Sequence, residues 1–315
     1  MKTIALGDSG IDVSTLCLGI LPFGTKVDRD TSFAILDAYY DAGGRFIDTA
    51  NNYSKWHANG VGTESETVLG EWMAARRNRD DLVIATKVGF NRADIGPSLS
   101  RTTIEAESAG SLKRLQTDRI DLYYAHADIR SDPLDQTLRA FDALVRSGKV
   151  RAIGCSNYRA WRIAEARAHS AANGWASYCC VQQRHSYLRP RPGASFGAQT
   201  SSNEDLIDYC RERPEVRLLA YSPLLNGAYT RADRDFPRQY PGAETDARIA
   251  VLRRIAGDLG ATENQVIYAW MLAGNPAVIP LTAPTTLDQL TENLGALTVA
   301  LTEELVTELD TAGNP

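Results

Sequence analysis

The sequence of 315 residues lacks the marks of several large classes of protein. No apolar run approaches the roughly 20 residues that a membrane-spanning helix needs, and the first residues turn polar too soon for a signal peptide. With a net charge of −5, the chain has no basic excess of the kind that a general nucleic-acid binder carries. We therefore expect a cytoplasmic protein whose partners are neither membranes nor nucleic acids.

Motifs for disulfides, metals and the commonest dinucleotide fold are also missing. The five cysteines include no Cys-x-x-Cys pair, which favours buried, reduced thiols over a disulfide framework. The four histidines show no His-x-His spacing, so we expect no metal site, and a metal-dependent barrel hydrolase or isomerase is a weak alternative. No Gly-x-Gly-x-x-Gly follows a strand-like run, so the Rossmann mode of dinucleotide binding is not supported.

What the sequence does have is an alternation of short apolar runs with amphipathic segments. The runs predict strands at 16–19, 45–48, 82–87, 120–126, 152–155, 179–182, 217–221 and 277–280. The segments predict helices that include 31–42, 64–75, 102–115, 133–148, 159–172 and 301–309. Eight such units indicate an α/β fold of the (β/α)₈ barrel type, in one domain over residues 1–315. A hairpin at 4–6 and 13–16 would plug the N-terminal end of the barrel.

Four polar residues stand at or just beyond the ends of the predicted strands. Asp48, Lys87 and His126 each close an apolar run, and Tyr53 lies five residues past Asp48. In a parallel barrel all strands end at one rim, so these side chains are expected to converge. Taken singly, each has a plain explanation, such as a surface tyrosine or a satisfied interior histidine. Lys87 is the hardest to explain in that way, because an ammonium on an apolar strand needs a partner.

Together the four residues make a proton-donating site. A tyrosine has a pKa near 10, too high for an efficient acid at neutral pH, and a nearby ammonium is expected to lower that pKa. A carboxylate holds the lysine charged and in place, and a histidine beside the phenol can orient a substrate oxygen. The set suits protonation of an oxygen that becomes an alkoxide as hydride reaches its carbon.

The segments around these residues resemble the aldo-keto reductase family over nearly the whole chain. The matching segments are GGRFIDTANNY (43–53), ATKVG (85–89), DRIDLYYAH (118–126), GKVRAIGCSN (148–157), AYSPL (220–224) and QLTEN (289–293). The resemblance implies NAD(P)H-dependent reduction of a small-molecule aldehyde or ketone. It implies that Tyr53 is the general acid, that Lys87 and Asp48 tune it, and that His126 orients the carbonyl.

The resemblance also implies how a cofactor binds, extended across the rim of the barrel. Ser156, Asn157 and Gln182 match positions that hold the nicotinamide amide, and Tyr221 matches the aromatic residue that stacks on the nicotinamide ring. Further matches are the pyrophosphate loop, Ser222, Pro223, Leu224 and Asn226, and the adenine-side residues Gln289 and Asn293. From the residues alone, Ser156 and Asn157 equally fit a helix cap, and Tyr221 equally fits a core aromatic residue.

One position departs from the family pattern. Thr285 stands where the family often has an arginine that grips the 2′-phosphate. A threonine can donate a hydrogen bond to a phosphate but cannot neutralise its charge. NADPH is the expected cofactor, NADH remains an alternative, and Arg231 or another loop arginine is a candidate for the missing charge.

The loops are expected to select the substrate. Trp56 and His57 follow Tyr53, and Phe23 follows the first barrel strand, so all three are candidate substrate contacts. The expected site is open, and suits a sugar or other polyhydroxy carbonyl as well as a plain aromatic aldehyde. The alternative function is a nucleotide-sensing regulatory subunit resembling potassium-channel β-subunits, against which His126 argues. Monomer and homo-oligomer both stay open.

Overall fold

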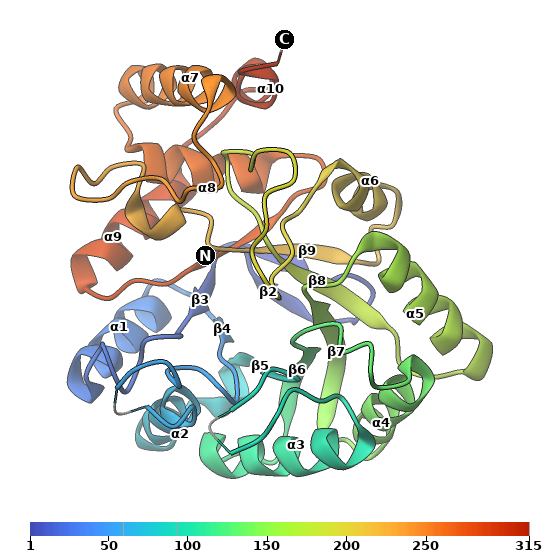
Figure 1. Ribbon diagram of the computed structural model, residues 1–315. Helices are drawn as coiled ribbons and strands as arrows, with labels where there is room; N and C mark the ends of the chain where they lie inside the picture. The colour runs from blue at the N-terminus through green and yellow to red at the C-terminus, as the bar shows by residue number, and fades with distance from the viewer. Residues whose placement is uncertain (59, 93, 315) are drawn as a thin grey trace.

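The computed structural model describes residues 1–58, 60–92 and 94–314, and its strands form a closed parallel barrel (Figure 1). The barrel strands are β3 (Cys17–Gly19), β4 (Phe46–Asp48), β5 (Val83–Val88), β6 (Ile120–Ala125), β7 (Val150–Ser156), β8 (Tyr178–Arg184), β9 (Arg217–Tyr221) and β10 (Ile279–Thr282). They follow one another in chain order around the barrel, and β10 closes it by pairing with both β9 and β3. The predicted (β/α)₈ barrel is therefore confirmed.

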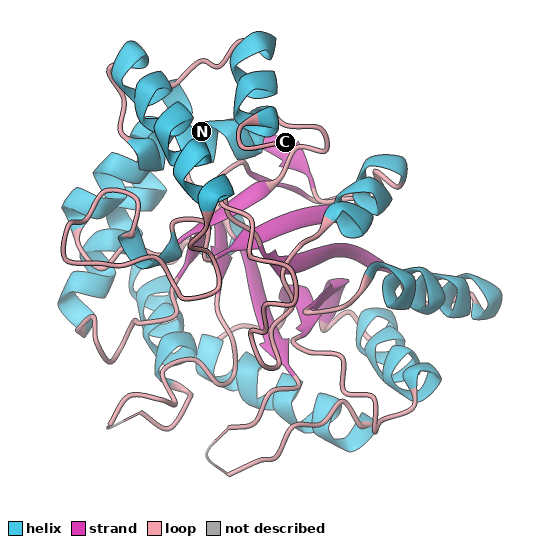
Figure 2. Ribbon diagram, turned by 45° about the horizontal axis from the view of Figure 1, so that its top comes forward, coloured by secondary structure: helices cyan, strands magenta, loops and turns pink. Residues whose placement is uncertain are grey.

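Helices surround the strands, while loops cross over one end of the barrel (Figure 2). The helices are α1 (Arg29–Asp41), α2 (Glu64–Arg76), α3 (Arg101–Leu115), α4 (Leu134–Arg146), α5 (Ala160–Asn173), α6 (Glu204–Glu212), α7 (Ala243–Leu259), α8 (Glu263–Ala273), α9 (Leu287–Gly295) and α10 (Glu303–Thr311). Within the described ranges, none of them is long and apolar enough to cross a membrane.

The start of helix α5 differs from the sequence-based interpretation. Its N-cap is Arg159, and no side chain there bonds the free backbone N–H groups of the first turn. The possibility that Ser156 or Asn157 caps this helix is therefore wrong. The Asn157 amide instead donates to the His126 carbonyl oxygen at 2.9 Å, so it ties two strand ends together.

The N-terminal hairpin closes the bottom of the barrel, as predicted. Its strands β1 (Thr3–Ala5) and β2 (Asp12–Ser14) pair antiparallel, and Leu6, Ile11 and Val13 pack on the barrel interior. The turn between them needs glycine at position 7, which has φ +57°. A Cβ atom there would lie 2.1 Å from the Cys179 carbonyl oxygen.

The alternation of each strand decides which side chains point inward. Along β5, Val83 and Ala85 pack in the cluster inside the barrel, whereas Ile84 packs outward with the surrounding helices. Successive side chains of a strand point to opposite faces, so Lys87 is the next inward position after Ala85. On β4, Asp48 lies two residues after the inward-facing Phe46, so its side chain also points into the barrel. Along β4 and β5 the inward positions are thus apolar lower in the barrel and charged at the C-terminal rim.

Candidate active site

Lys87 lies at the centre of the site and has no exposed surface. Its Nζ atom donates to Asp48 Oδ1, to the Thr49 carbonyl oxygen at 2.7 Å and to the Tyr53 hydroxyl at 2.7 Å. These three contacts use all three donors of an ammonium group. Because Asp48 is also fully buried, the two charges form an ion pair inside the protein. Burial lowers the pKa of Lys87, while the Asp48 carboxylate acts in the opposite direction.

Tyr53 reaches this pair from the loop after β4 and is 8% exposed. Its hydroxyl accepts from Lys87 and donates to Asp48 Oδ1 at 3.3 Å. Burial, followed by the charge of Asp48, raises the pKa of the Tyr53 phenol well above its ordinary value of 10.0. The expected lowering by the ammonium is therefore not the net effect, because burial and the carboxylate outweigh it. The phenol is consequently held in its protonated, donating form.

His126 follows β6 and faces the phenol. Its ring centroid lies 6.0 Å from that of Tyr53 and 4.6 Å from that of Phe90. Burial and the nearby Lys87 charge hold the pKa of His126 well below its ordinary value of 6.5, so the imidazole is neutral. Its buried Nδ1 atom has no hydrogen-bond partner among the described residues. A neutral imidazole of this kind can donate to a carbonyl oxygen without competing for the proton of Tyr53.

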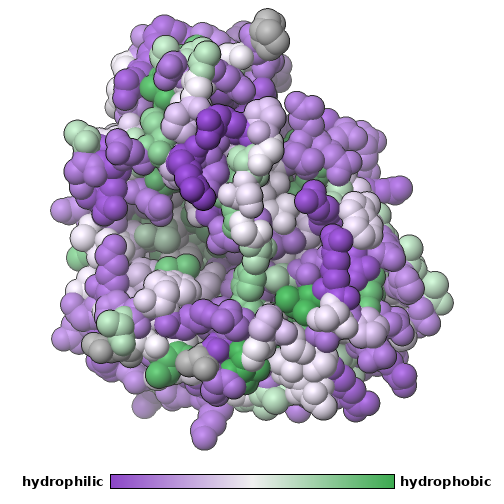
Figure 3. All heavy atoms as spheres, viewed as in Figure 1, coloured by the Kyte–Doolittle hydropathy of each residue, from purple (hydrophilic) through white to green (hydrophobic). Residues whose placement is uncertain are grey.

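A cavity of about 730 Å³ runs along the rim beside these residues. It is lined by Asp48, Tyr53 and His126, while Lys87 does not line it but contacts Asp48 and Tyr53. All eleven predicted cofactor residues line it as well: Ser156, Asn157, Gln182, Tyr221, Ser222, Pro223, Leu224, Asn226, Thr285, Gln289 and Asn293. Figure 3 shows this face hollowed, within a mostly hydrophilic surround. Three residues of the predicted tetrad and all the predicted cofactor residues thus border one space.

The predicted nicotinamide residues are linked to one another by hydrogen bonds. Asn157 Oδ1 accepts from the Tyr221 hydroxyl at 2.7 Å, and Ser156 Oγ donates to the Gln182 carbonyl oxygen at 2.8 Å. Asn157 has φ +61°, a left-handed conformation that asparagine tolerates better than most residues. The side chains of Ser156, Asn157 and Tyr221 are therefore tied to one another and to the backbone of β8 before any ligand binds.

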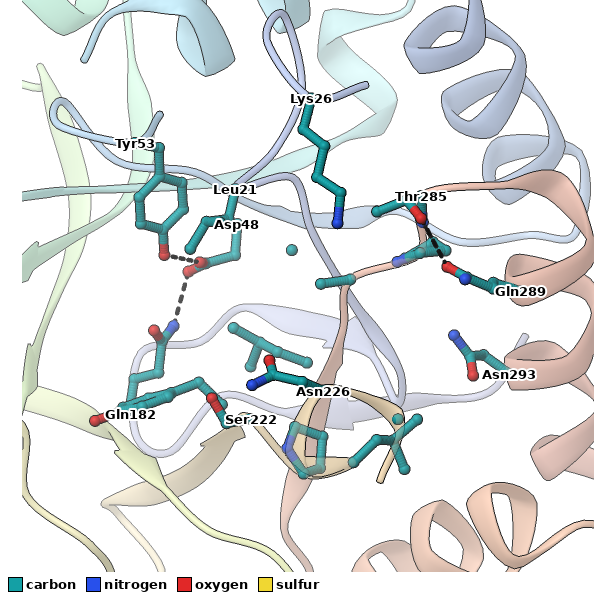
Figure 4. A pocket seen from close by; sticks show the side chains of 18 of the residues that line it. Leu21, Lys26, Asp48, Tyr53, Gln182, Ser222, Asn226, Thr285, Gln289 and Asn293 are labelled. Atoms are coloured by element: carbon teal, nitrogen blue, oxygen red, sulfur yellow. Dashed lines mark hydrogen bonds between the residues drawn. The ribbon is translucent and has the colours of Figure 1, made fainter. Parts of the chain in front are cut away.

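The opposite end of the cavity has a different character (Figure 4). Gln289 Oε1 accepts from the Thr285 backbone N–H at 2.8 Å and its hydroxyl at 3.1 Å, and Asn293 donates to Thr282. Lys26 extends into the cavity near Thr285 in this view. Amides, hydroxyls and a cation at this end fit the adenosine and phosphate groups of a dinucleotide, and Tyr221 offers an aromatic face at the other end.

The three predicted substrate contacts lie in different places. Trp56 lines the cavity, is 58% exposed, and meets the Tyr53 ring edge-on at 6.4 Å between centroids. Phe23 is fully buried in the core beneath α1 and does not line the cavity. The expectation that Phe23 contacts the substrate is therefore corrected. His57 is not among the residues that line the cavity either. The loop after Tyr53 thus contributes Trp56 to the cavity.

Sequence reasoning missed several residues that line the cavity. Phe90 stands two residues beyond the end of β5, and the same strand-end argument that found Lys87 could have found it. Lys26 and Arg234 come from loops, where no periodic signal marks them. Arg231, named only as a candidate, also lines the cavity, but it forms a 2.6 Å ion pair with Asp233.

Comparison with known proteins gives a consistent result. A model of the aldo/keto reductase family matches residues 15–314. The oxidoreductase YrpG of Bacillus subtilis is 32% identical to this chain, covering 98% of the chain and 95% of YrpG. Norsolorinic acid reductase A of Aspergillus parasiticus is 30% identical, covering 96% and 79%. An aryl-alcohol dehydrogenase of Pestalotiopsis microspora is 27% identical over the same shares. The chain therefore belongs to the aldo/keto reductase family of oxidoreductases, in agreement with its barrel and with the residues gathered at the rim.

Proposed function

We propose that this protein is an NADPH-dependent reductase that converts an aldehyde or ketone to the alcohol, with Tyr53 as the proton donor. The observation that carries the proposal is the position of a protonated, buried phenol at one end of a long cavity. The cofactor, when bound, supplies the hydride. The protein supplies the proton, the orientation of the carbonyl and the exclusion of water.

Each residue of the tetrad has a role that its contacts support. Tyr53 gives its proton to the substrate oxygen as negative charge develops there. Lys87, 2.7 Å from the phenol oxygen, stabilises the phenolate that remains. Asp48 keeps Lys87 charged and fixed, because a lone buried ammonium would tend to lose its proton. His126, held neutral, donates to the same substrate oxygen and aims the carbonyl at Tyr53.

Cations along the cavity support NADPH as the cofactor. Lys26, Arg231 and Arg234 all line it, so positive charge is available for phosphate groups although Thr285 supplies none. Phosphates are commonly bound by such lysine and arginine side chains. Arg231 pairs with Asp233 at 2.6 Å and Arg234 pairs with the same carboxylate at 3.9 Å, which leaves Lys26 as the stronger candidate.

The walls near Tyr53 support an aromatic carbonyl as the substrate. Leu21, Trp56 and Phe90 line the cavity there, with Asn52 and Gln199 as polar neighbours. The hydroxyls of a sugar would lose hydration against three apolar side chains, whereas an aromatic ring would gain by burial. The names of two relatives, a norsolorinic acid reductase and an aryl-alcohol dehydrogenase, suit this choice. The polyhydroxy carbonyl expected from the sequence is the competing candidate.

The function is tested by following oxidation of NADPH by the purified protein. We expect oxidation only when a carbonyl is added, with kcat/KM for an activated aryl aldehyde at least about tenfold above that for an aldose. NADH measured in parallel should give a lower kcat/KM. Tight NADPH binding without carbonyl-dependent oxidation would favour the nucleotide-sensing alternative. Absence of NADPH binding would refute both functions.

The pH dependence of turnover provides a second prediction. The raised pKa of Tyr53 keeps the phenol protonated above pH 10.0, and the lowered pKa of His126 keeps the imidazole neutral below pH 6.5. Reduction needs the protonated phenol of Tyr53. Because the pKa of this phenol is raised, an increase in pH through the neutral range does not remove its proton. We expect kcat for reduction to change by less than about twofold between roughly pH 6.5 and 9. A steady fall across this window would show that the phenol loses its proton there.

A further inference from the structure

Gln182 makes a contact that the cofactor-binding assignment does not explain. It lies near the end of β8, is 2% exposed, and donates from Nε2 to Asp48 Oδ2 at 2.8 Å. Figure 4 shows its side chain pointing at Asp48, which in turn contacts Tyr53. The glutamine therefore joins the cofactor cavity directly to the carboxylate of the tetrad.

The chemistry of Asp48 fixes which end of the amide faces it. An ionised carboxylate can only accept hydrogen bonds, so the NH₂ group of Gln182 must point toward it. The amide oxygen then points elsewhere, and none of the described residues donates a hydrogen bond to it. Because Gln182 lines the cavity, this oxygen is left as an acceptor toward the space where a cofactor would lie.

The two oxygens of Asp48 have separate tasks. Oδ1 accepts from Lys87 and Tyr53, and Oδ2 accepts from Gln182. A carboxylate held at one oxygen alone can rotate about its Cβ–Cγ bond, because that torsion is soft. The bond from Gln182 fixes the plane of the carboxylate and keeps Oδ1 directed at the lysine and the phenol.

We propose that Gln182 is a positioning residue for the proton donor, acting through Asp48, and that it couples the cofactor cavity to the tetrad. Its NH₂ group holds Asp48, while its oxygen is the atom that would hold the nicotinamide amide already assigned to Gln182. The second half of this proposal rests on the proposed function, and the first half does not. Coupling of this kind is reciprocal, so a change at Asp48 alters cofactor affinity through Gln182.

A double-mutant cycle between Gln182 and Asp48 tests the proposal. The variants are Gln182→Met, which keeps the length of the side chain, Asp48→Asn, and the two combined. We expect Gln182→Met to lower kcat at saturating NADPH by roughly tenfold, the loss of one hydrogen bond to a charged group. In the Asp48→Asn background the same change should lower kcat by less than about threefold. The NADPH dissociation constant should rise in Gln182→Met and also, by a smaller factor, in Asp48→Asn.

The neighbouring glutamine provides a matched control. Gln183 is equally buried on the same strand but donates to the Tyr158 carbonyl oxygen, away from Asp48. Gln183→Met should therefore change kcat by the same factor whether or not Asp48→Asn is also present. A purely structural loss would affect Gln182 and Gln183 variants alike.

A measurement that does not depend on enzyme activity can test the positioning role of Gln182 separately from the proposed function. Urea unfolding of wild type, the two single variants and the double variant needs no cofactor. We expect Gln182→Met to lower the unfolding midpoint more when Asp48 is intact than in the Asp48→Asn background. Equal falls in both backgrounds, in unfolding and in kcat, would overturn the positioning role. If wild type reduces no carbonyl, the proposed function fails, while the unfolding cycle still decides whether Gln182 acts on Asp48.

Discussion

Tyr53→Phe is expected to lower kcat for carbonyl reduction by about 10²- to 10⁴-fold, the usual contribution of a positioned general acid. The substitution removes a single oxygen atom, the one that accepts from Lys87 and donates to Asp48. Lys87 keeps its contacts with Asp48 and the Thr49 carbonyl oxygen, so the ion pair survives. Steady-state reduction of an aryl aldehyde by both proteins measures the effect.

Two controls separate the loss of the proton donor from damage to the protein. The NADPH dissociation constant should change by less than about threefold, because the phenol oxygen makes no contact with the predicted cofactor residues. The free energy of unfolding should fall by about 1.5–3 kcal/mol, because the hydroxyl is hydrogen-bonded to two charged groups. If the Tyr53→Phe variant retained more than about a third of the wild-type kcat, Tyr53 could not be the acid.

Lys87→Met is expected to lower the free energy of unfolding by about 3–5 kcal/mol, the usual cost of breaking a fully buried ion pair. Both partners of this pair have no exposed surface, so water cannot replace the lost ammonium. Among the residues with described positions, the Asp48 carboxylate would keep Tyr53 and Gln182 as its side-chain donors, in a medium that disfavours charge. Urea unfolding followed by circular dichroism gives the difference.

The double variant Lys87→Met/Asp48→Asn tests the reason for the loss. Removing both charges should recover at least half of the stability lost in Lys87→Met, because no uncompensated charge stays buried. Lys149→Met, at an exposed lysine, should change the free energy of unfolding by less than about 0.5 kcal/mol. A loss below about 1 kcal/mol in Lys87→Met would mean that the pair is better hydrated than its burial indicates.

The strand pattern of the sequence predicted the barrel and the meeting of Asp48, Lys87 and His126 at its rim, for a definite physical reason, whereas the cofactor residues were proposed from the family resemblance. Inward positions recur every two residues, so the polar residue that ends each apolar run is carried to the same rim. Strand β9 was predicted at both its limits, whereas β10 begins and ends two residues later than predicted. The predicted strand ends at Pro280, a residue type that is rarely found within a central strand. Here the strand continues past it to Thr282.

Properties that depend on how deeply a side chain is buried, or on which way it points, could not be predicted in the same way. The direction of the Tyr53 pKa follows from how completely the phenol is buried, and a pattern of residue types does not state that. Phe23 follows a strand end, as Phe90 does, yet one turns into the core and the other toward the cavity. A Ser-Asn pair before a helix is typical of a cap, although here Asn157 bonds to His126 instead. In each example the local sequence is compatible with both outcomes, and the tertiary contacts decide between the two.

The closure of the barrel by β10 has a consequence for how this protein is made on the ribosome. Asp48, Tyr53, Lys87 and His126 all emerge in the first half of synthesis, but β3 gains its second neighbour only when β10 has been translated. Until then β3 and β9 are unpaired edge strands that can pair with other chains. The barrel around the ion pair between Lys87 and Asp48 is also incomplete. The burial of this pair therefore waits for contacts between the two ends of the chain, which are the slowest kind to form.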